Sequence, residues 1–153
     1  MSDSTGALTA LDAFVGEWNV AGAMTLDEPM EIGGWTGYEW IEGGGFLVQR
    51  STTEREEFPN TLAVIGPRDE GDGYLMHYFD SRGVSRVYEM ALDGRSWTLE
   101  RAPSGPRSDF WQRWIGEFSE DGNTIKGRWE NSENGSDWAI DFHLTYTRIR
   151  DGG

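Results

Sequence analysis

Short turn-forming segments recur along the whole chain, and they constrain the fold more than any other feature of the sequence. Glycine, proline, asparagine and aspartate dominate these segments because each favours a tight reversal of the backbone. Their spacing is typical of the strand-plus-turn pattern of an all-β barrel or sandwich. The nine turns are Asp27-Glu28-Pro29, Glu42-Gly43-Gly44-Gly45, Phe58-Pro59-Asn60, 66–73, Ser81-Arg82-Gly83, Asp93-Gly94, 103–106, 120–123 and Asn134-Gly135.

The stretches between the turns have the composition of β-strands, with β-branched and aromatic residues throughout. Asp-Gly and Asn-Gly pairs join several of them by turns so short that the neighbouring strands must be antiparallel. The sequence therefore predicts a meander of ten strands: Glu17–Met24, Trp35–Ile41, Phe46–Glu54, Thr61–Ile65, Tyr74–Phe79, Val84–Leu92, Ser96–Arg101, Phe110–Phe118, Thr124–Glu130 and Trp138–Arg150. One short N-terminal helix of two turns is predicted from the spacing of Leu8, Leu11, Phe14 and Val15.

An antiparallel meander has two exposed edges unless it closes into a barrel, and closure removes both of them. A ten-stranded barrel has an interior wide enough to hold one small ligand. Aromatic residues fall on both faces of Tyr74–Asp80 and of Phe110–Ile115, which predicts a partly polar interior and a partly covered exterior. Because no change of composition marks a linker, we expect one domain over residues 1–153.

The net charge limits the partners of the chain. Thirteen basic residues against 27 acidic residues give a formal net charge of −14 at pH 7, which repels nucleic-acid phosphates and anionic lipids. Nucleic-acid and membrane partners are therefore not expected, and a homodimer is left open. The absence of cysteine excludes disulfides and thiolate metal sites, and no metal site is expected. Residues 1–6 carry no basic region and lead to no apolar core, so we expect no secretory signal and a cytoplasmic protein.

The segment Phe14-Val15-Gly16-Glu17-Trp18, which follows the predicted helix, resembles the Gly-x-Trp opening of the calycin superfamily. That superfamily includes lipocalins, fatty-acid-binding proteins and nitrobindins. The segments Tyr38–Val48 and His77–Gly83 resemble small bacterial calycin-like proteins of unassigned function. The resemblance implies a β-barrel in which the first-strand Trp18 packs against an arginine of the last strand. Arg148 or Arg150 is placed to fill that position, because a planar guanidinium can stack on an indole ring.

The eight tryptophans exceed the usual share for a chain of this length, and each offers a large apolar area with one N–H donor. We interpret them, together with tyrosines, as the wall of an interior cavity that binds a small, largely apolar or aromatic ligand. The aromatic candidates for this wall are Tyr38, Trp40, Tyr88, Trp97, Trp111, Trp114, Trp129 and Trp138.

Four polar residues are candidates to anchor a ligand or to catalyse a reaction in the same cavity. His77 lies between Met76 and Tyr78, and Glu39 lies in an aromatic strand, with Arg50 and Arg86 as candidate ion-pair partners. If both His77 and Glu39 face inward, they could act as acid and base, which is the minimum for proton-transfer catalysis. The alternative function is therefore a small barrel enzyme, such as a cyclase, an isomerase or a hydrolase. A core histidine and a structural salt bridge explain the same residues without chemistry.

His143 supports a third alternative. Nitrobindins bind haem through one histidine of the last strand, and Phe142-His143-Leu144 resembles that neighbourhood, which implies haem as a cofactor. The nitrobindin glycine pattern after the first-strand tryptophan is replaced here by Asn19-Val20-Ala21-Gly22. His143 also shares its strand face with polar residues, whereas Phe142 and Leu144 lie on the apolar face. A solvent-facing or hydrogen-bonded histidine remains the simpler interpretation, and no cofactor is the primary expectation.

Overall fold

The fold was analysed in a computed structural model, which describes residues 9–25, 28–41, 43–53, 59–68 and 73–149. For residues 23–25 and 28–33 it describes the backbone alone. The described residues form ten strands: β1 (Gly16–Thr25), β2 (Glu28–Trp40), β3 (Leu47–Thr52), β4 (Thr61–Pro67), β5 (Tyr74–Asp80), β6 (Ser85–Asp93), β7 (Ser96–Arg101), β8 (Trp111–Phe118), β9 (Thr124–Ser132) and β10 (Ala139–Arg148). Two 3₁₀ helices accompany them, η1 (Leu11–Phe14) and η2 (Pro106–Ser108).

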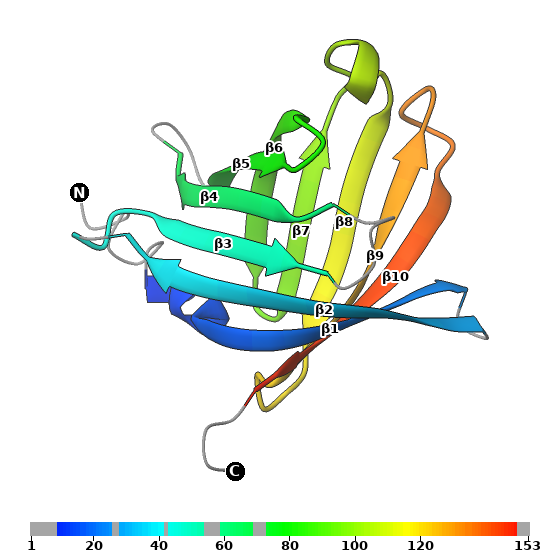
Figure 1. The fold of residues 1–153 in the computed structure, drawn as a ribbon. Helices are drawn as coiled ribbons and strands as arrows, with labels where there is room; N and C mark the ends of the chain where they lie inside the picture. The colour runs from blue at the N-terminus through cyan, green and yellow to red at the C-terminus, as the bar shows by residue number, and fades with distance from the viewer. Residues whose placement is uncertain (1–8, 26–27, 42, 54–58, 69–72, 150–153) are drawn as a thin grey trace.

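Each strand pairs with the next one in the chain in the antiparallel sense, and β10 pairs with β1 to close a barrel (Figure 1). Trp18 lies opposite Arg148 and Val20 lies opposite Tyr146 across this closing seam. The predicted all-β meander barrel of ten strands is therefore confirmed. Among the described residues, neither helix is long and apolar enough to span a membrane.

Two predicted elements differ from the structure. The N-terminal helix is a single 3₁₀ turn rather than two α-helical turns. Leu11 and Phe14 are its buried residues, and their i, i+3 spacing matches the three-residue repeat of a 3₁₀ helix. Strand β2 begins at Glu28, well before the predicted start at Trp35. The prediction missed its first part because Pro29 and two consecutive glycines are uncommon inside strands.

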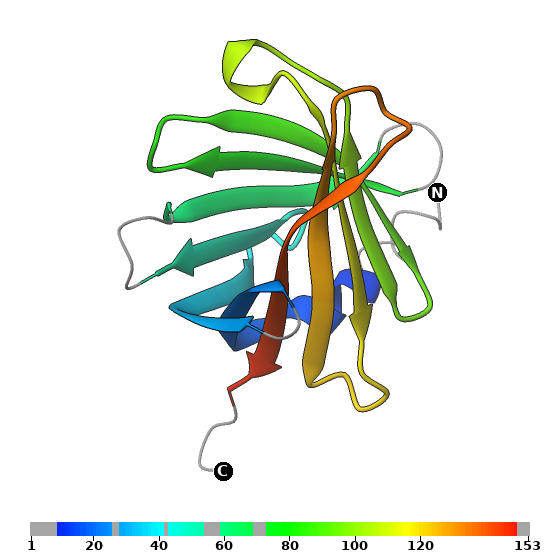
Figure 2. The same ribbon diagram turned by 90° about the vertical axis from the view of Figure 1, so that its right-hand side faces the viewer.

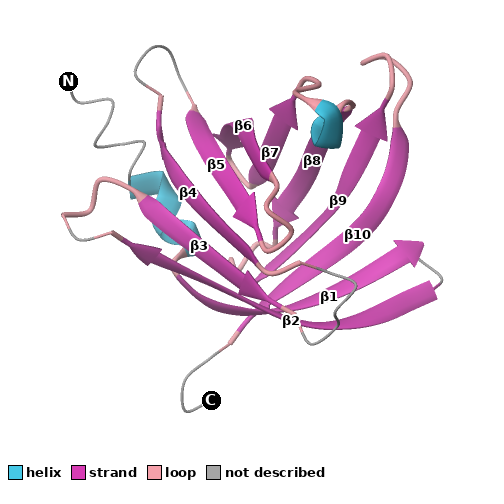
Figure 3. Cartoon of the chain, turned by 45° about the horizontal axis from the view of Figure 1, so that its top comes forward, coloured by secondary structure: helices cyan, strands magenta, loops and turns pink. Residues whose placement is uncertain are grey.

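The two ends of the barrel differ. Helix η1 lies across one end, which we call the closed end, and the β7–β8 loop with η2 stands at the other, which we call the open end (Figures 2 and 3). At the closed end Phe14 contacts Tyr38, Trp97 and Phe118, with ring centroids 5.1, 4.8 and 5.2 Å away. Trp18 is fully buried beside them and donates from Nε1 to the Phe14 carbonyl oxygen at 2.9 Å.

Arg148 seals the closed end. Its guanidinium lies 4.2 Å from the centroid of the Trp18 ring and donates to the carbonyl oxygens of Val15 and Ala13 at 2.6 and 2.7 Å. This confirms the contact expected between the first-strand tryptophan and an arginine of the last strand. Arg150, the other candidate for that contact, lies outside the described residues.

Candidate functional site

A cavity of about 560 Å³ occupies the barrel between the packed closed end and the open end. This volume lies within the range of small-molecule binding sites. Its wall changes in character along the barrel, since aromatic and aliphatic side chains form the floor and polar side chains surround the mouth. Among the residues on the floor are Val20, Met76, Tyr88, Trp97, Leu99, Trp114, Trp129, Phe142, Leu144 and Tyr146. Among those at the mouth are Thr36, Gln49, Ser51, Thr61, Tyr78, Arg82, Arg86, Arg107 and Gln112.

Aromatic rings in mutual contact form the floor of the cavity. The Trp114 ring lies 5.3 Å from Trp97, 5.5 Å from Trp129 and 6.1 Å from Tyr146, and Tyr88 lies 5.6 Å from Trp129, all measured between centroids. The indole N–H groups of Trp97 and Trp114 are buried and meet no acceptor among the described residues. The floor is therefore rigid and apolar, and it carries donors that the protein itself does not use.

Two glycines give the Trp114 ring its place against the wall. A Cβ atom at Gly116 would lie 2.7 Å from Trp114 Nε1, and one at Gly127 would collide with the same ring. The indole therefore lies flat over backbone that carries no side chain, and the volume above it stays open. These glycines on β8 and β9 determine the depth of the cavity.

A hydrogen-bonded group of three residues stands at one side of the mouth. Asp80 accepts from the Tyr78 hydroxyl at 2.8 Å and from Arg82 Nη2 at 2.6 Å, and its other oxygen accepts from the Arg82 backbone N–H. Burial acts to raise the pKa of Asp80, but these hydrogen bonds outweigh burial and lower it to about 2. Burial and the same carboxylate raise the pKa of Tyr78 far above its usual value. Asp80 is therefore a fixed anion that neutralises Arg82.

A second polar group begins on the neighbouring strand β6, where Arg86 lies opposite Tyr78 and where β6 and β7 separate beyond the Glu89–Glu100 pair. Arg86 donates from Nε to Ser108 Oγ at 2.7 Å and from Nη2 to the Arg107 carbonyl oxygen at 3.0 Å. Tyr88 donates to Gln112 Oε1 at 2.8 Å, and Arg101 Nε donates to the same oxygen at 2.9 Å. This network fixes Tyr88 and Gln112 on the cavity wall.

Arg101 is the most deeply buried cation of this network, with 6% of its surface exposed. It donates from Nη1 to the carbonyl oxygens of Ser108 and Phe110 at 3.0 and 3.2 Å, so it also holds the β7–β8 loop in place. Burial lowers the pKa of Arg101, and the neighbouring charge of Arg86 acts in the same direction. Burial raises the pKa of Tyr88, although both arginines act to lower it. The two guanidinium groups therefore lie near the same tyrosine.

Five of the predicted wall and ligand-binding residues line the cavity: Arg86, Tyr88, Trp97, Trp114 and Trp129. Their part in binding stays a prediction. Tyr38 and Trp40 lie elsewhere, since Tyr38 packs on Phe14 at the closed end and Trp40 donates from Nε1 to Asp12 at 3.0 Å. The prediction that these two line the cavity was wrong, because their part of β2 lies at the plugged end of the barrel.

Two predicted wall tryptophans face outward instead. Trp111 alternates with the inward Gln112 on β8, and its ring covers Gly135 in the β9–β10 turn. Trp138 lies 4.0 Å from the Arg113 guanidinium, which pairs with the buried Glu130. Both tryptophans lie on the outer wall of β8 to β10 and not in the cavity wall, so their assignment to the cavity was wrong.

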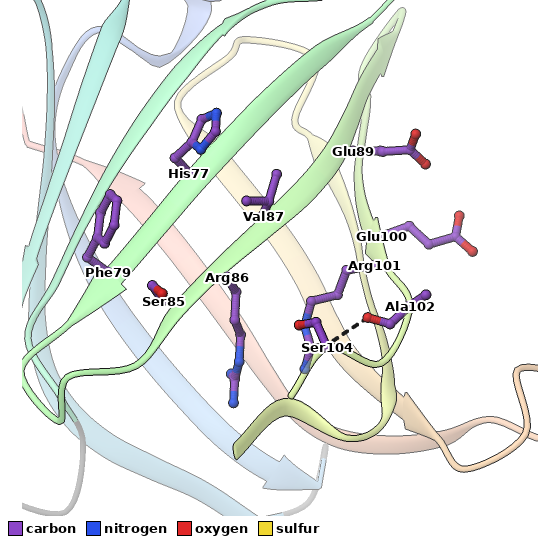
Figure 4. Close-up of a pocket in the computed structure, with 10 residues that line it drawn as sticks. All are labelled: His77, Phe79, Ser85, Arg86, Val87, Glu89, Glu100, Arg101, Ala102 and Ser104. Carbon is purple, nitrogen blue, oxygen red and sulfur yellow. Dashed lines mark hydrogen bonds between the residues drawn. The ribbon is translucent and has the colours of Figure 1, made fainter. Parts of the chain in front are cut away.

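The predicted pair of His77 and Glu39 is not assembled. Glu39 is exposed on the outer wall, where it forms an ion pair with Arg50, so Arg50 does not reach the cavity either. His77 is also exposed and lines an outer hollow of about 460 Å³ with Phe79 and Val87 (Figure 4). Three strand spacings, about 14 Å along the wall, separate Glu39 from His77. The two side chains cannot share a proton at this distance.

His143 does not face the cavity. Its neighbours Phe142 and Leu144 line the cavity, and the alternation of a strand turns His143 to the outer wall, across from Arg128 of β9. Because His77 is also on the outer wall, neither histidine of the chain can bind haem inside the barrel. The residues present therefore do not fit a histidine-ligated haem in this cavity.

Sequence reasoning missed several residues of the site. Arg101 and Gln112 were not singled out, although each falls on the same strand face as apolar wall residues, Leu99 and Trp114 respectively. A polar residue at an inward position of an otherwise apolar face was the signal available in the sequence. Phe142 and Leu144 were assigned to one apolar face but not to a ligand site, and Tyr146 lies on the same face.

Comparison with known proteins identifies a similar fold. No protein family model matches the chain, and no curated protein matches its sequence. The solved structure of Rv2717c from M. tuberculosis is similar, with a TM-score of 0.64 over 94% of this chain and 98% of that chain. The two sequences are 17% identical, so the likeness concerns the fold alone.

Proposed function

We propose that the protein is a calycin-like barrel that binds a small, largely apolar or aromatic molecule in its interior cavity. The observation that carries this proposal is the 560 Å³ cavity above a floor of contacting aromatic rings. A barrel that served only as a stable scaffold would fill this volume with its own side chains, since protein interiors are close-packed. The Trp18–Arg148 stack supports the calycin-like assignment.

The position of the polar groups supports binding rather than catalysis. Asp80, beside the mouth, already accepts hydrogen bonds from Tyr78 and Arg82 and has a pKa of about 2. A group that remains ionised at neutral pH and is fully hydrogen-bonded is a poor general base. Both histidines lie on the outer wall, so the cavity offers recognition groups and no histidine for proton transfer.

The proposal is tested by uptake of N-phenyl-1-naphthylamine, a neutral aromatic dye that becomes fluorescent in apolar surroundings. We expect saturable binding of one dye per chain, with energy transfer from the tryptophans of the floor. Val20→Phe, which adds a ring to the cavity wall, should weaken binding at least about tenfold. Val87→Phe makes the same change on the outer wall, where the side chain is 51% exposed, and should leave binding unchanged.

Two results would contradict the proposal. The first is a wild-type protein that takes up no dye. The second is a Val20→Phe variant that is folded and binds the dye as tightly as the wild type, because the dye would then lie outside the barrel.

A further inference from the structure

The mouth of the cavity carries positive charge in a protein whose net charge is −14. Arg82, Arg86 and Arg107 line the cavity, whereas Asp141 is the only carboxylate of the described residues that does so. Asp80 neutralises Arg82 through an ion pair at 2.6 Å. Arg86 and Arg107 form no ion pair with any carboxylate that the structure describes. The surplus charge of the mouth therefore lies on the β6 side.

Arg86 and Arg101 lie close together, and both donate hydrogen bonds only to uncharged acceptors. Their guanidinium carbons lie 5.4 and 4.5 Å from the centroid of the same ring, Phe110, and both side chains extend toward the β7–β8 loop (Figure 4). Their acceptors are one hydroxyl, one amide oxygen and backbone carbonyl oxygens. The charge of Arg86 acts on Arg101 and lowers its pKa, so the two like charges repel each other.

Arg101 lacks one hydrogen bond as well as a counter-ion. Its Nη2 is buried and has no partner among the described residues, although the side chain is only 6% exposed. A buried guanidinium without a carboxylate is costly, because desolvation is not repaid by an ion pair. Retaining this buried cation and the half-buried Arg86 beside a ligand-sized cavity is expected when the missing negative charge comes from the ligand.

We propose that the ligand is an organic monoanion, whose carboxylate or sulfonate-type end binds at Arg86 and whose apolar body lies on the tryptophan floor. This inference rests on the proposed cavity binding and specifies the class of ligand. Arg86 contacts the anion because it lines the cavity, and Arg101 reinforces the positive potential from behind Phe110 and Gln112. Only one guanidinium faces the cavity, and the second lies behind it. The site therefore offers direct charge-assisted hydrogen bonds to one anionic group.

A matched pair of dyes tests the inference. 1-Anilinonaphthalene-8-sulfonate has the ring skeleton of N-phenyl-1-naphthylamine and adds one sulfonate, so the two probes differ in charge more than in shape. We expect the wild type to bind the sulfonate dye at least about tenfold more tightly than the neutral dye. Arg86→Met should abolish this preference.

Arg95→Met is the matched control, because it removes the same charge from the exposed β6–β7 turn at the closed end. It should preserve the preference for the sulfonate dye. A competition assay on the wild type tests the same point without any variant. Decanoate should displace the neutral dye at about tenfold lower concentration than decanamide, its uncharged counterpart.

The outcomes separate the two proposals. Binding of both dyes with equal affinity, or a preference that survives in Arg86→Met, would overturn the anion site and leave cavity binding intact. Failure of the wild type to bind either dye would overturn the cavity binding, and this inference with it.

Discussion

The two ends of the barrel are built from the same ten strands, but one end is filled by side chains and the other opens into a cavity. At the closed end the inward positions carry Leu47, Met90 and Trp97, all of which are buried. Four residues along the same strands, the inward positions become Ser51, Arg86 and Arg101. Each of these strands therefore changes from apolar to polar along its inner face.

This gradient separates stability from recognition. The closed end is filled by contacting aromatic rings and is covered by Arg148, so its side chains contribute mainly to packing. The open end keeps an unfilled volume and polar groups that bond to one another around it. The comparison implies that substitutions at the closed end should change folding, and substitutions at the mouth should change ligand binding.

The largest effect is expected from removing a ring at the closed end. Trp18→Ala deletes a fully buried indole, and it should lower the free energy of unfolding by about 3–5 kcal/mol. Trp129→Ala deletes an indole that already faces the cavity, so it should cost less than half as much and should weaken dye binding instead. Urea denaturation followed by circular dichroism measures both values. Equal losses of stability would break the comparison between the two ends.

Arg148 gives the next largest effect. Arg148→Met removes two hydrogen bonds to the carbonyl oxygens of Ala13 and Val15 and the stack on Trp18, and it should cost about 2–3 kcal/mol. Arg148→Lys keeps the charge but not the planar fork, so it should recover only part of the loss. Thermal unfolding of the three proteins at one pH is the measurement. Full recovery by lysine would mean that charge alone seals the closed end.

The turns could be predicted because their signals are local, whereas closure was predicted from the need to pair the two edges of the meander. Asp93-Gly94 and Asn134-Gly135 need only their own backbone preferences to form hairpins, and Gly94 and Gly135 do adopt positive φ angles of 61° and 79°. The closing contact of Trp18 with Arg148 came from the resemblance rather than from any local pattern.

The inner face of each strand could not be predicted as well. On β5 both faces are apolar or aromatic, with Met76 and Tyr78 on one and Leu75 and Phe79 on the other, so the sequence could not place His77. Only the cross-strand neighbours decide, since His77 lies between Val64 and Val87 on the outer wall. A register shift between Ile140 and Phe142 on β10 adds a further change that no local pattern encodes.

Acid should affect the mouth through Asp80. The folded pKa of about 2 lies below the unfolded value of 3.8, so Asp80 stabilises the fold above pH 3.8 and loses this contribution as the pH falls through 2. We expect Asp80→Asn to cost about 1–2 kcal/mol at pH 7 and progressively less between pH 4 and pH 2. Urea titrations of both proteins across this range measure the difference. A constant difference would show that Asp80 acts by shape rather than by charge.

The smallest effect is expected on the outer wall, which belongs to neither end. Glu39 and Arg50 form an ion pair there with side chains that are 68% and 54% exposed, and such pairs contribute between about 0 and 1 kcal/mol. Glu39→Gln should therefore change stability by less than about 0.5 kcal/mol and leave dye binding unchanged. His77→Gln should behave in the same way, because its side chain also faces away from the cavity. A loss of binding in either variant would place recognition on the outer wall, and the division of the barrel into a packed end and a binding end would then have to be abandoned.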